Sequence, residues 1–83
     1  MPISDKEYVA VENGETKIKI RVAGKEGGYM AVMDCVDVRL KSHFKPPDPL
    51  LIGDTISEVI AHCKTWIKEN LEIDIDIHEK RTK

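Results

Sequence analysis

Aromatic side chains are scarce in this 83-residue chain, which holds two tyrosines, one phenylalanine and one tryptophan. A core must therefore be built mainly from aliphatic residues, and a domain of this size buries only a modest fraction of its surface. We expect a single domain over residues 1–83. We also expect self-association, as a homodimer or a larger oligomer, because a second copy would add the buried area that a small core lacks.

The sequence also lacks a strong net charge, a long apolar run and the amino-terminal pattern of a signal peptide. A net charge of −2 supplies no broad positive field, so nucleic-acid binding is not expected. No apolar segment approaches the length of a membrane span, and the first seven residues have neither a basic start nor an apolar run. We therefore expect a soluble, cytoplasmic protein with no membrane partner.

Cysteine is equally scarce, and no catalytic motif stands out among the polar residues. Cys35 falls in an apolar strand and Cys63 on an apolar helical stripe, so both are interpreted as buried hydrophobic residues and not as a disulfide framework. The histidines and cysteines lack the spacing of a zinc site, and the glycine-rich turn at 24–28 lacks the phosphate-loop fingerprint. We predict no metal, no cofactor and no enzymatic activity.

Carboxylates provide the one catalytic alternative. Nuclease sites gather acidic side chains on a sheet and an adjoining helix to hold magnesium. The residues that could do so here are Asp34, Asp37, Glu58, Asp74 and Asp76. We favour the interpretation that they are solvated or structural, because Glu58 belongs to a helix cap and the last two share the outer face of a strand.

The residues around Thr55 predict the start of a helix. In Thr55-Ile56-Ser57-Glu58, the threonine can accept from the N–H of Glu58 while the glutamate reaches back to Thr55, which is a capping box. The apolar residues that follow recur at helical spacing and form one stripe: Ile56, Val59, Ile60, Cys63 and Ile67. We predict a helix from about Thr55 to about Asn70.

Alternating polarity predicts the strands. Residues 16–22 and 72–78 each place isoleucine or valine on one face, with a basic and an acidic outer face respectively, which would complement each other if these strands were neighbours. A further strand starts at Tyr29, and residues 29–40 form either one strand bent near Asp34 or two strands. Whether residues 7–11 pair across the Asn-Gly turn is left open. The predicted core comprises Ile18, Ile20, Val22, Met30, Val32, Ile56, Val59, Ile60, Cys63, Ile67, Ile73, Ile75 and Ile77.

A proline-rich loop over residues 41–52 is the candidate partner-binding feature. Its prolines exclude regular structure and pre-order the loop, so little entropy is lost on docking. The candidate residues are two apolar anchors and three surrounding cations: Phe44, Leu50, Arg39, Lys41 and Lys45. In the alternative interpretation, the two anchors pin the loop to the domain's own core or to a second copy. A weak, salt-sensitive contact with RNA is a lesser alternative.

The order of these features resembles the HicB-like antitoxin family. Members typically show a tyrosine-containing strand after a Gly-Gly turn, matched here by Gly27-Gly28-Tyr29. They then carry a Gly-Asp-Thr loop end and a helix with glutamate three residues past the threonine, matched by Gly53-Asp54-Thr55 and Glu58. Cys63 and Ile67 stand at the usual small and aliphatic positions of that helix. The resemblance covers about residues 16–77.

The resemblance implies a fold and a role. The fold is α+β, with a mainly antiparallel sheet of three or four strands in the order β-β-β-α-β and one long helix on one face. It would be a degraded ribonuclease H-like or double-stranded-RNA-binding-like arrangement, in a short member of the family without a DNA-binding domain. The role is to bind and neutralise a small ribonuclease toxin, and the alternative is an orphan domain. We expect residues 1–6 and 79–83 to be flexible.

Overall fold

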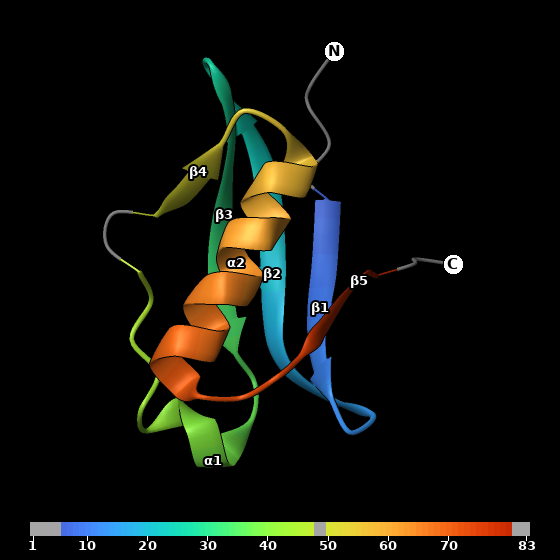
Figure 1. The fold of residues 1–83 in the computed structure, drawn as a ribbon, viewed down its shortest axis with the longest axis vertical. Helices are drawn as coiled ribbons and strands as arrows, with labels where there is room; N and C mark the ends of the chain where they lie inside the picture. The colour runs from blue at the N-terminus through green and yellow to red at the C-terminus, as the bar shows by residue number, and fades with distance from the viewer. Residues whose placement is uncertain (1–5, 48–49, 81–83) are drawn as a thin grey trace.

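The computed structural model describes residues 6–47 and 50–80. Five antiparallel strands form one open sheet in the order β4-β3-β2-β1-β5, and helix α2 crosses one face of it (Figure 1). The elements are β1 (Lys6–Glu12), β2 (Glu15–Lys25), β3 (Gly28–Cys35), α1 (Val38–Lys41), β4 (Leu51–Gly53), α2 (Ile56–Leu71) and β5 (Asp76–Glu79). The α+β class and the helix-covered antiparallel sheet are confirmed, whereas the prediction of three or four strands was wrong.

The first hairpin shows that residues 7–11 are paired. Asn13 and Gly14 both have positive φ angles, 54° and 81°, as the tightest hairpin turns require. The turn lets β1 pair with β2 from Lys6 opposite Val22 to Glu12 opposite Glu15. Lys6 lies at the start of β1 and Glu79 at the end of β5, while residues 1–5 and 81–83 lie outside the described part of the chain.

The register of β3 corrects two predicted core residues. Met33 lies opposite Ile20 and Ala31 opposite Val22, so the buried face of β3 consists of Ala31, Met33 and Cys35. Met30 and Val32 point to the other side of the sheet, and Val32 is 38% exposed. The prediction was wrong because residues 29–33 are continuously apolar, and such a run does not say which alternate residues face the core.

The chain after Cys35 forms a turn of helix, so both predictions for residues 29–40 were wrong. Asp37 caps α1 because its Oδ1 accepts hydrogen bonds from the backbone N–H groups of Arg39 at 2.8 Å and Leu40 at 3.1 Å. The unpredicted strand β4 then adds to the edge of β3. His62 of α2 donates from Nδ1 to the carbonyl oxygen of Ile52 at 3.0 Å and fastens this edge strand to the helix.

Helix α2 matches its predicted limits to within one residue at each end, although 16 residues is an ordinary length. Thr55 Oγ1 accepts from the N–H of Glu58 at 3.1 Å, as predicted. The returning bond of the box differs, because Glu58 accepts from the N–H of Asp54 at 2.7 Å. The helix buries Val59, Cys63 and Ile67 against the sheet. Both cysteines are buried and free, as predicted.

The last strand is shorter than predicted and lies at the edge of the sheet. Residues 72–75 form an irregular connection that begins at Glu72, whose φ of 57° ends α2 in the left-handed conformation. Only residues 76–79 pair, and they pair with β1. The acidic face of this segment therefore does not neighbour the basic face of β2, because β1 lies between them. Ile75 is buried in the core, and Ile73 and Ile77 pack against it half-buried.

Candidate functional site

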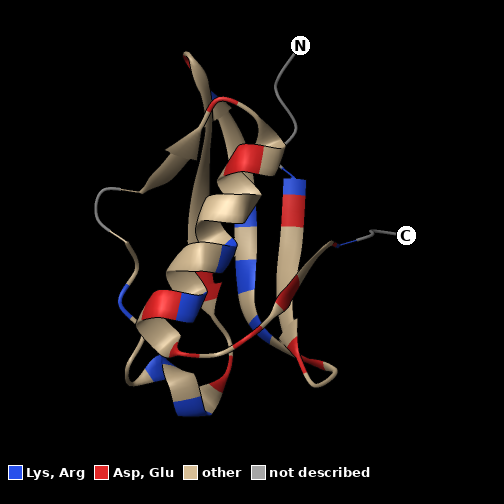
Figure 2. Ribbon diagram, viewed as in Figure 1, with Lys and Arg blue, Asp and Glu red and all other residues tan. Residues whose placement is uncertain are grey.

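The five candidate partner-binding residues lie along the side of the sheet that β3 and β4 form. Arg39 and Lys41 are exposed on α1, and Lys45 is exposed in the loop that leads from α1 toward β4. Leu50 precedes β4 at the other end of this side and is 36% exposed. Figure 2 shows the resulting concentration of basic residues on α1, at the end of the molecule opposite the start of α2.

Phe44 faces inward and contacts the tryptophan of α2. Its ring meets that of Trp66 edge to face, with centroids 5.8 Å apart and planes at 77°. Such a pair adds about 0.5–1.5 kcal/mol beyond simple burial. Phe44 is therefore half-buried against the core and fixes the loop to the helix, which is the packing that the alternative interpretation gave it.

Sequence reasoning missed the most exposed large apolar residue of the described chain. Val38 is 86% exposed at the first position of α1, and Val36 beside it is 39% exposed. The spacing of Val36, Val38 and Leu40 suits a strand with one buried face, so the pattern hid this exposure. The signal that could have revealed it is Asp37, whose side chain favours the cap of a helix. We define the α1 surface as Val36, Val38, Arg39 and Lys41.

An ion pair beneath the α1 surface holds it in place. Lys17 of β2, only 9% exposed, donates from Nζ to Asp37 Oδ2 at 2.7 Å and to Glu15 Oε1 at 3.1 Å. The Lys17 hydrogen bond lowers the pKa of Asp37, and the same bond, with that to Glu15, raises the pKa of Lys17. One carboxylate oxygen of Asp37 therefore accepts from Lys17, and the other accepts from the backbone N–H groups at the start of α1.

The carboxylates of the nuclease alternative do not gather at one place. Asp34 projects from the sheet face opposite α2, whereas Asp37 is engaged by Lys17. Asp74 forms an exposed pair with Lys68 at 3.6 Å. Within residues 6–47 and 50–80 no three His, Cys, Asp or Glu side chains come together as ligands for a metal ion.

Acid should loosen the corner of the molecule that carries α1. The pKa of Asp37 is below its ordinary value of 3.8, so its contribution to stability is complete above that value and is lost as pH falls through the lowered pKa. We expect Asp37→Asn to destabilise the protein at neutral pH and to weaken the fall of stability in acid. Urea unfolding at neutral and acidic pH measures both effects, with Glu69→Gln, an exposed change on α2, as the control. An unchanged pH dependence in Asp37→Asn would contradict this prediction.

The two motifs that carry the family resemblance meet in space. Tyr29 lies opposite Gly53 in the sheet, and a Cβ atom at Gly28 would collide with the carbonyl oxygen of Gly53. A Cβ at Gly53 would in turn lie 3.0 Å from the Val59 side chain. The glycines are therefore needed for the close approach of β3, β4 and α2.

Comparisons with protein-family models, with curated proteins and with solved structures find no match for this chain. In the part of the chain that the structure describes, no helix is both long and apolar enough to span a membrane. The fold defines the class of domain. It is an α+β domain in which helix α2 covers one face of an open antiparallel sheet.

Proposed function

We propose that this protein is a non-catalytic protein-binding module of the HicB antitoxin type, which binds and neutralises a small ribonuclease toxin. The order of the Gly27-Gly28-Tyr29 and Gly53-Asp54-Thr55 motifs supports the family assignment. The proposed binding role rests on Val38, which is 86% exposed on α1. The ion pair between Lys17 and Asp37 holds this helix against the sheet. Val36 is exposed beside Val38, and Arg39 and Lys41 are exposed around them, so the α1 surface has the apolar centre and polar rim of a protein-binding patch.

The α1 surface is organised before any partner arrives. Lys17 and Asp37 fix its base, and the contact between Phe44 and Trp66 fixes the loop that follows it. Little conformational entropy remains to be lost when a partner docks, so more of the contact energy appears as affinity. Lys45 and Leu50 would extend the contact along the loop toward β4.

The chemistry of the α1 surface constrains its partner. Val36 and Val38 would enter a small apolar pocket, and Arg39 and Lys41 would meet an acidic rim around it. A ribonuclease holds RNA phosphates with basic side chains. The basic α1 surface would therefore pack beside the RNA groove of the toxin, and would obstruct it sterically without entering it.

The test is a pull-down from the native cell at low and moderate salt. The parent protein should recover a small protein with ribonuclease activity, which the complex suppresses. Val38→Asp should lower the recovery at least about tenfold, because a carboxylate in an apolar pocket costs more than about 1.4 kcal/mol. Lys64→Ala, an exposed change on α2, is the control. Undiminished recovery by Val38→Asp, or the absence of any bound ribonuclease, would contradict the proposal.

A further inference from the structure

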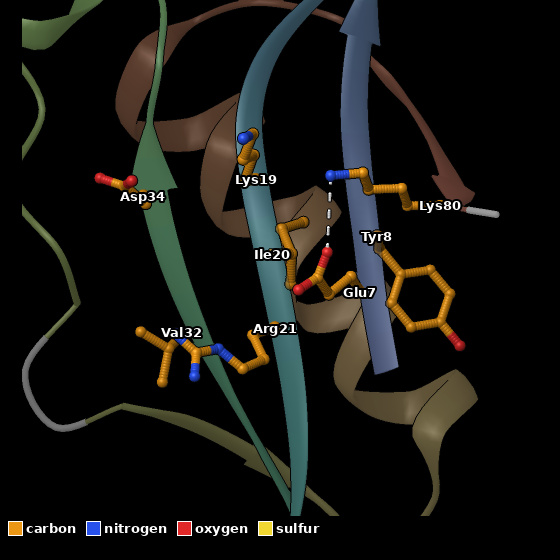
Figure 3. Close-up of a pocket in the computed structure, with 8 residues that line it drawn as sticks. All are labelled: Glu7, Tyr8, Lys19, Ile20, Arg21, Val32, Asp34 and Lys80. Atoms are coloured by element: carbon orange, nitrogen blue, oxygen red, sulfur yellow. Dashed lines mark ion pairs between the residues drawn. The ribbon is translucent and has the colours of Figure 1, made fainter. Parts of the chain in front are cut away.

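The face of the sheet opposite α2 carries both apolar and charged side chains, and no other element of the described chain covers it. We call it the open face; Figure 3 looks onto its centre, with α2 behind the sheet. Its apolar residues are Val9, Ala23, Met30, Val32 and Ile52, and its charged residues include Glu7, Lys19, Arg21, Asp34 and Lys80. A depression of about 200 Å³ lies among the charged side chains.

The charges of the open face alternate in sign from strand to strand. Lys19 of β2 lies directly opposite Asp34 of β3, and Arg21 lies opposite Glu7 of β1 and Val32 of β3. Glu7 already pairs with Lys80 at 3.6 Å. Among the described residues, neither Lys19 nor Asp34 forms an ion pair within its own chain, and in Figure 3 the Asp34 carboxylate points away from β2.

We propose that a second copy of this chain covers the open face, related by a two-fold axis that runs parallel to the strands between β2 and β3. Such an axis lays β2 of each copy over β3 of the other at the same height along the strands. Lys19 then faces Asp34 of the second copy, and symmetry makes the same contact twice. The dimer therefore contains two ion pairs, each between Lys19 of one copy and Asp34 of the other. Within one chain these two residues lie opposite each other on β2 and β3.

The apolar residues favour the same axis. Ala23 lies opposite Met30, and Met30 lies opposite Ile52, so an apolar row crosses β2, β3 and β4, with Arg21 and Val32 between this row and the two ion pairs. Val32 adjoins this row on β3. An axis between β1 and β2 would instead place the centre of the contact on Glu7, which Lys80 already neutralises. An axis between β2 and β3 therefore covers more apolar area than an axis between β1 and β2. It also brings Asp34, which has no ion-pair partner among the described residues of its own chain, against Lys19 of the second copy.

A second copy suits the open face better than a partner of one charge. A nucleic acid or a strongly acidic protein would meet carboxylates as well as cations, whereas a self-complementary face satisfies both signs. The molecule measures 38 Å by 32 Å across its two longer axes, which leaves room for the ~800 Å² that each partner buries in a standard interface. The α1 surface stays uncovered, so this inference is independent of the proposed function.

Sedimentation equilibrium with charge-reversed variants tests the pairing directly. The parent should be a dimer whose dissociation constant rises with salt. Lys19→Glu, and separately Asp34→Lys, should raise that constant about 100-fold, because each creates two like-charge contacts across the two-fold axis. The double variant should regain the parent value to within about tenfold, since the ion pairs are restored with their signs exchanged.

Two further variants locate the interface. Met30→Glu should weaken the dimer as strongly as Lys19→Glu, because it places a carboxylate against Ala23 of the second copy, whereas Val38→Glu on the α1 surface should leave it intact. Far-UV circular dichroism checks that each variant keeps its fold, which is expected because all these side chains are at least partly exposed. A protein that is monomeric up to about 1 mM, or a dimer indifferent to both Lys19→Glu and Met30→Glu, would overturn the proposal.

Discussion

Val59→Asp should unfold the protein. Val59 is fully buried in α2, within the cluster that contains Ile18, Ile20 and Ile67. An aspartate there would place a carboxylate among aliphatic side chains with no partner, at a cost of several kcal/mol. Small domains have only about 5–15 kcal/mol of total stability, so this loss removes most of it. Far-UV circular dichroism and urea unfolding measure the result.

The matched control is the same substitution at an exposed valine. Val38→Asp changes an 86% exposed side chain and should alter the free energy of unfolding by no more than about 0.5 kcal/mol. The pair separates the effect of burial from the effect of adding a charge. A cooperatively folded Val59→Asp protein would show that the buried face of α2 is assigned incorrectly.

Gly28→Ala should destabilise the protein much more than Gly27→Ala. Both glycines have positive φ, 155° at Gly28 and 86° at Gly27, so either substitution strains the backbone by roughly 1–3 kcal/mol. Only at Gly28 would the new Cβ also collide with the carbonyl oxygen of Gly53, while the Cβ at Gly27 meets open space. The additional loss at Gly28 arises because β4 must move away from β3.

Urea unfolding of the two alanine variants measures this difference. Both variants carry the strain of a positive φ, and only Gly28→Ala adds the collision between β3 and β4. Nuclear magnetic resonance should locate the disturbance at residues 51–53 in Gly28→Ala and only at the turn in Gly27→Ala. Equal losses of stability would contradict a close approach at Gly28.

The features that sequence predicted well are those set by local patterns. The capping residues Thr55 and Glu58 and the stripe at Val59, Cys63 and Ile67 placed α2 to within one residue at each end. The alternation of Ile18, Ile20 and Val22 likewise fixed the buried face of β2. In both elements the spacing of apolar residues is strict, so only one face can turn toward the core.

The features that sequence did not predict depend on contacts between distant residues. The apolar run of β3 fits two registers, and only pairing with β2 chooses the one that buries Met33 and exposes Val32. The strand β4 is too short to show any period, and it forms because β3 offers an edge. The position of β5 beside β1 likewise has no local signal.

The candidate site was predicted in part for the same reason. Arg39, Lys41 and Lys45 are exposed, as basic residues in a turn or loop usually are. The inward position of Phe44 depends on Trp66, which is more than twenty residues further along the chain. The exposure of Val38 depends on whether residues 38–41 are helix or strand, and one capping aspartate was the only local sign.

The antiparallel pairing of β5 with β1 brings the beginning and the end of the described chain to one corner of the sheet. The N–H of Lys80 donates to the carbonyl oxygen of Glu7 at 2.7 Å, and Lys6 and Glu79 form an ion pair at 3.8 Å. A short linker could join these ends, and the chain could be opened instead at the Asn13-Gly14 turn. In such a circular permutant β5 and β1 would become a hairpin. The pairing of β5 with β1 would then be local, while the pairing of β1 with β2 would become the most distant in the chain, so the entropy cost of closing a long loop would pass from one side of β1 to the other.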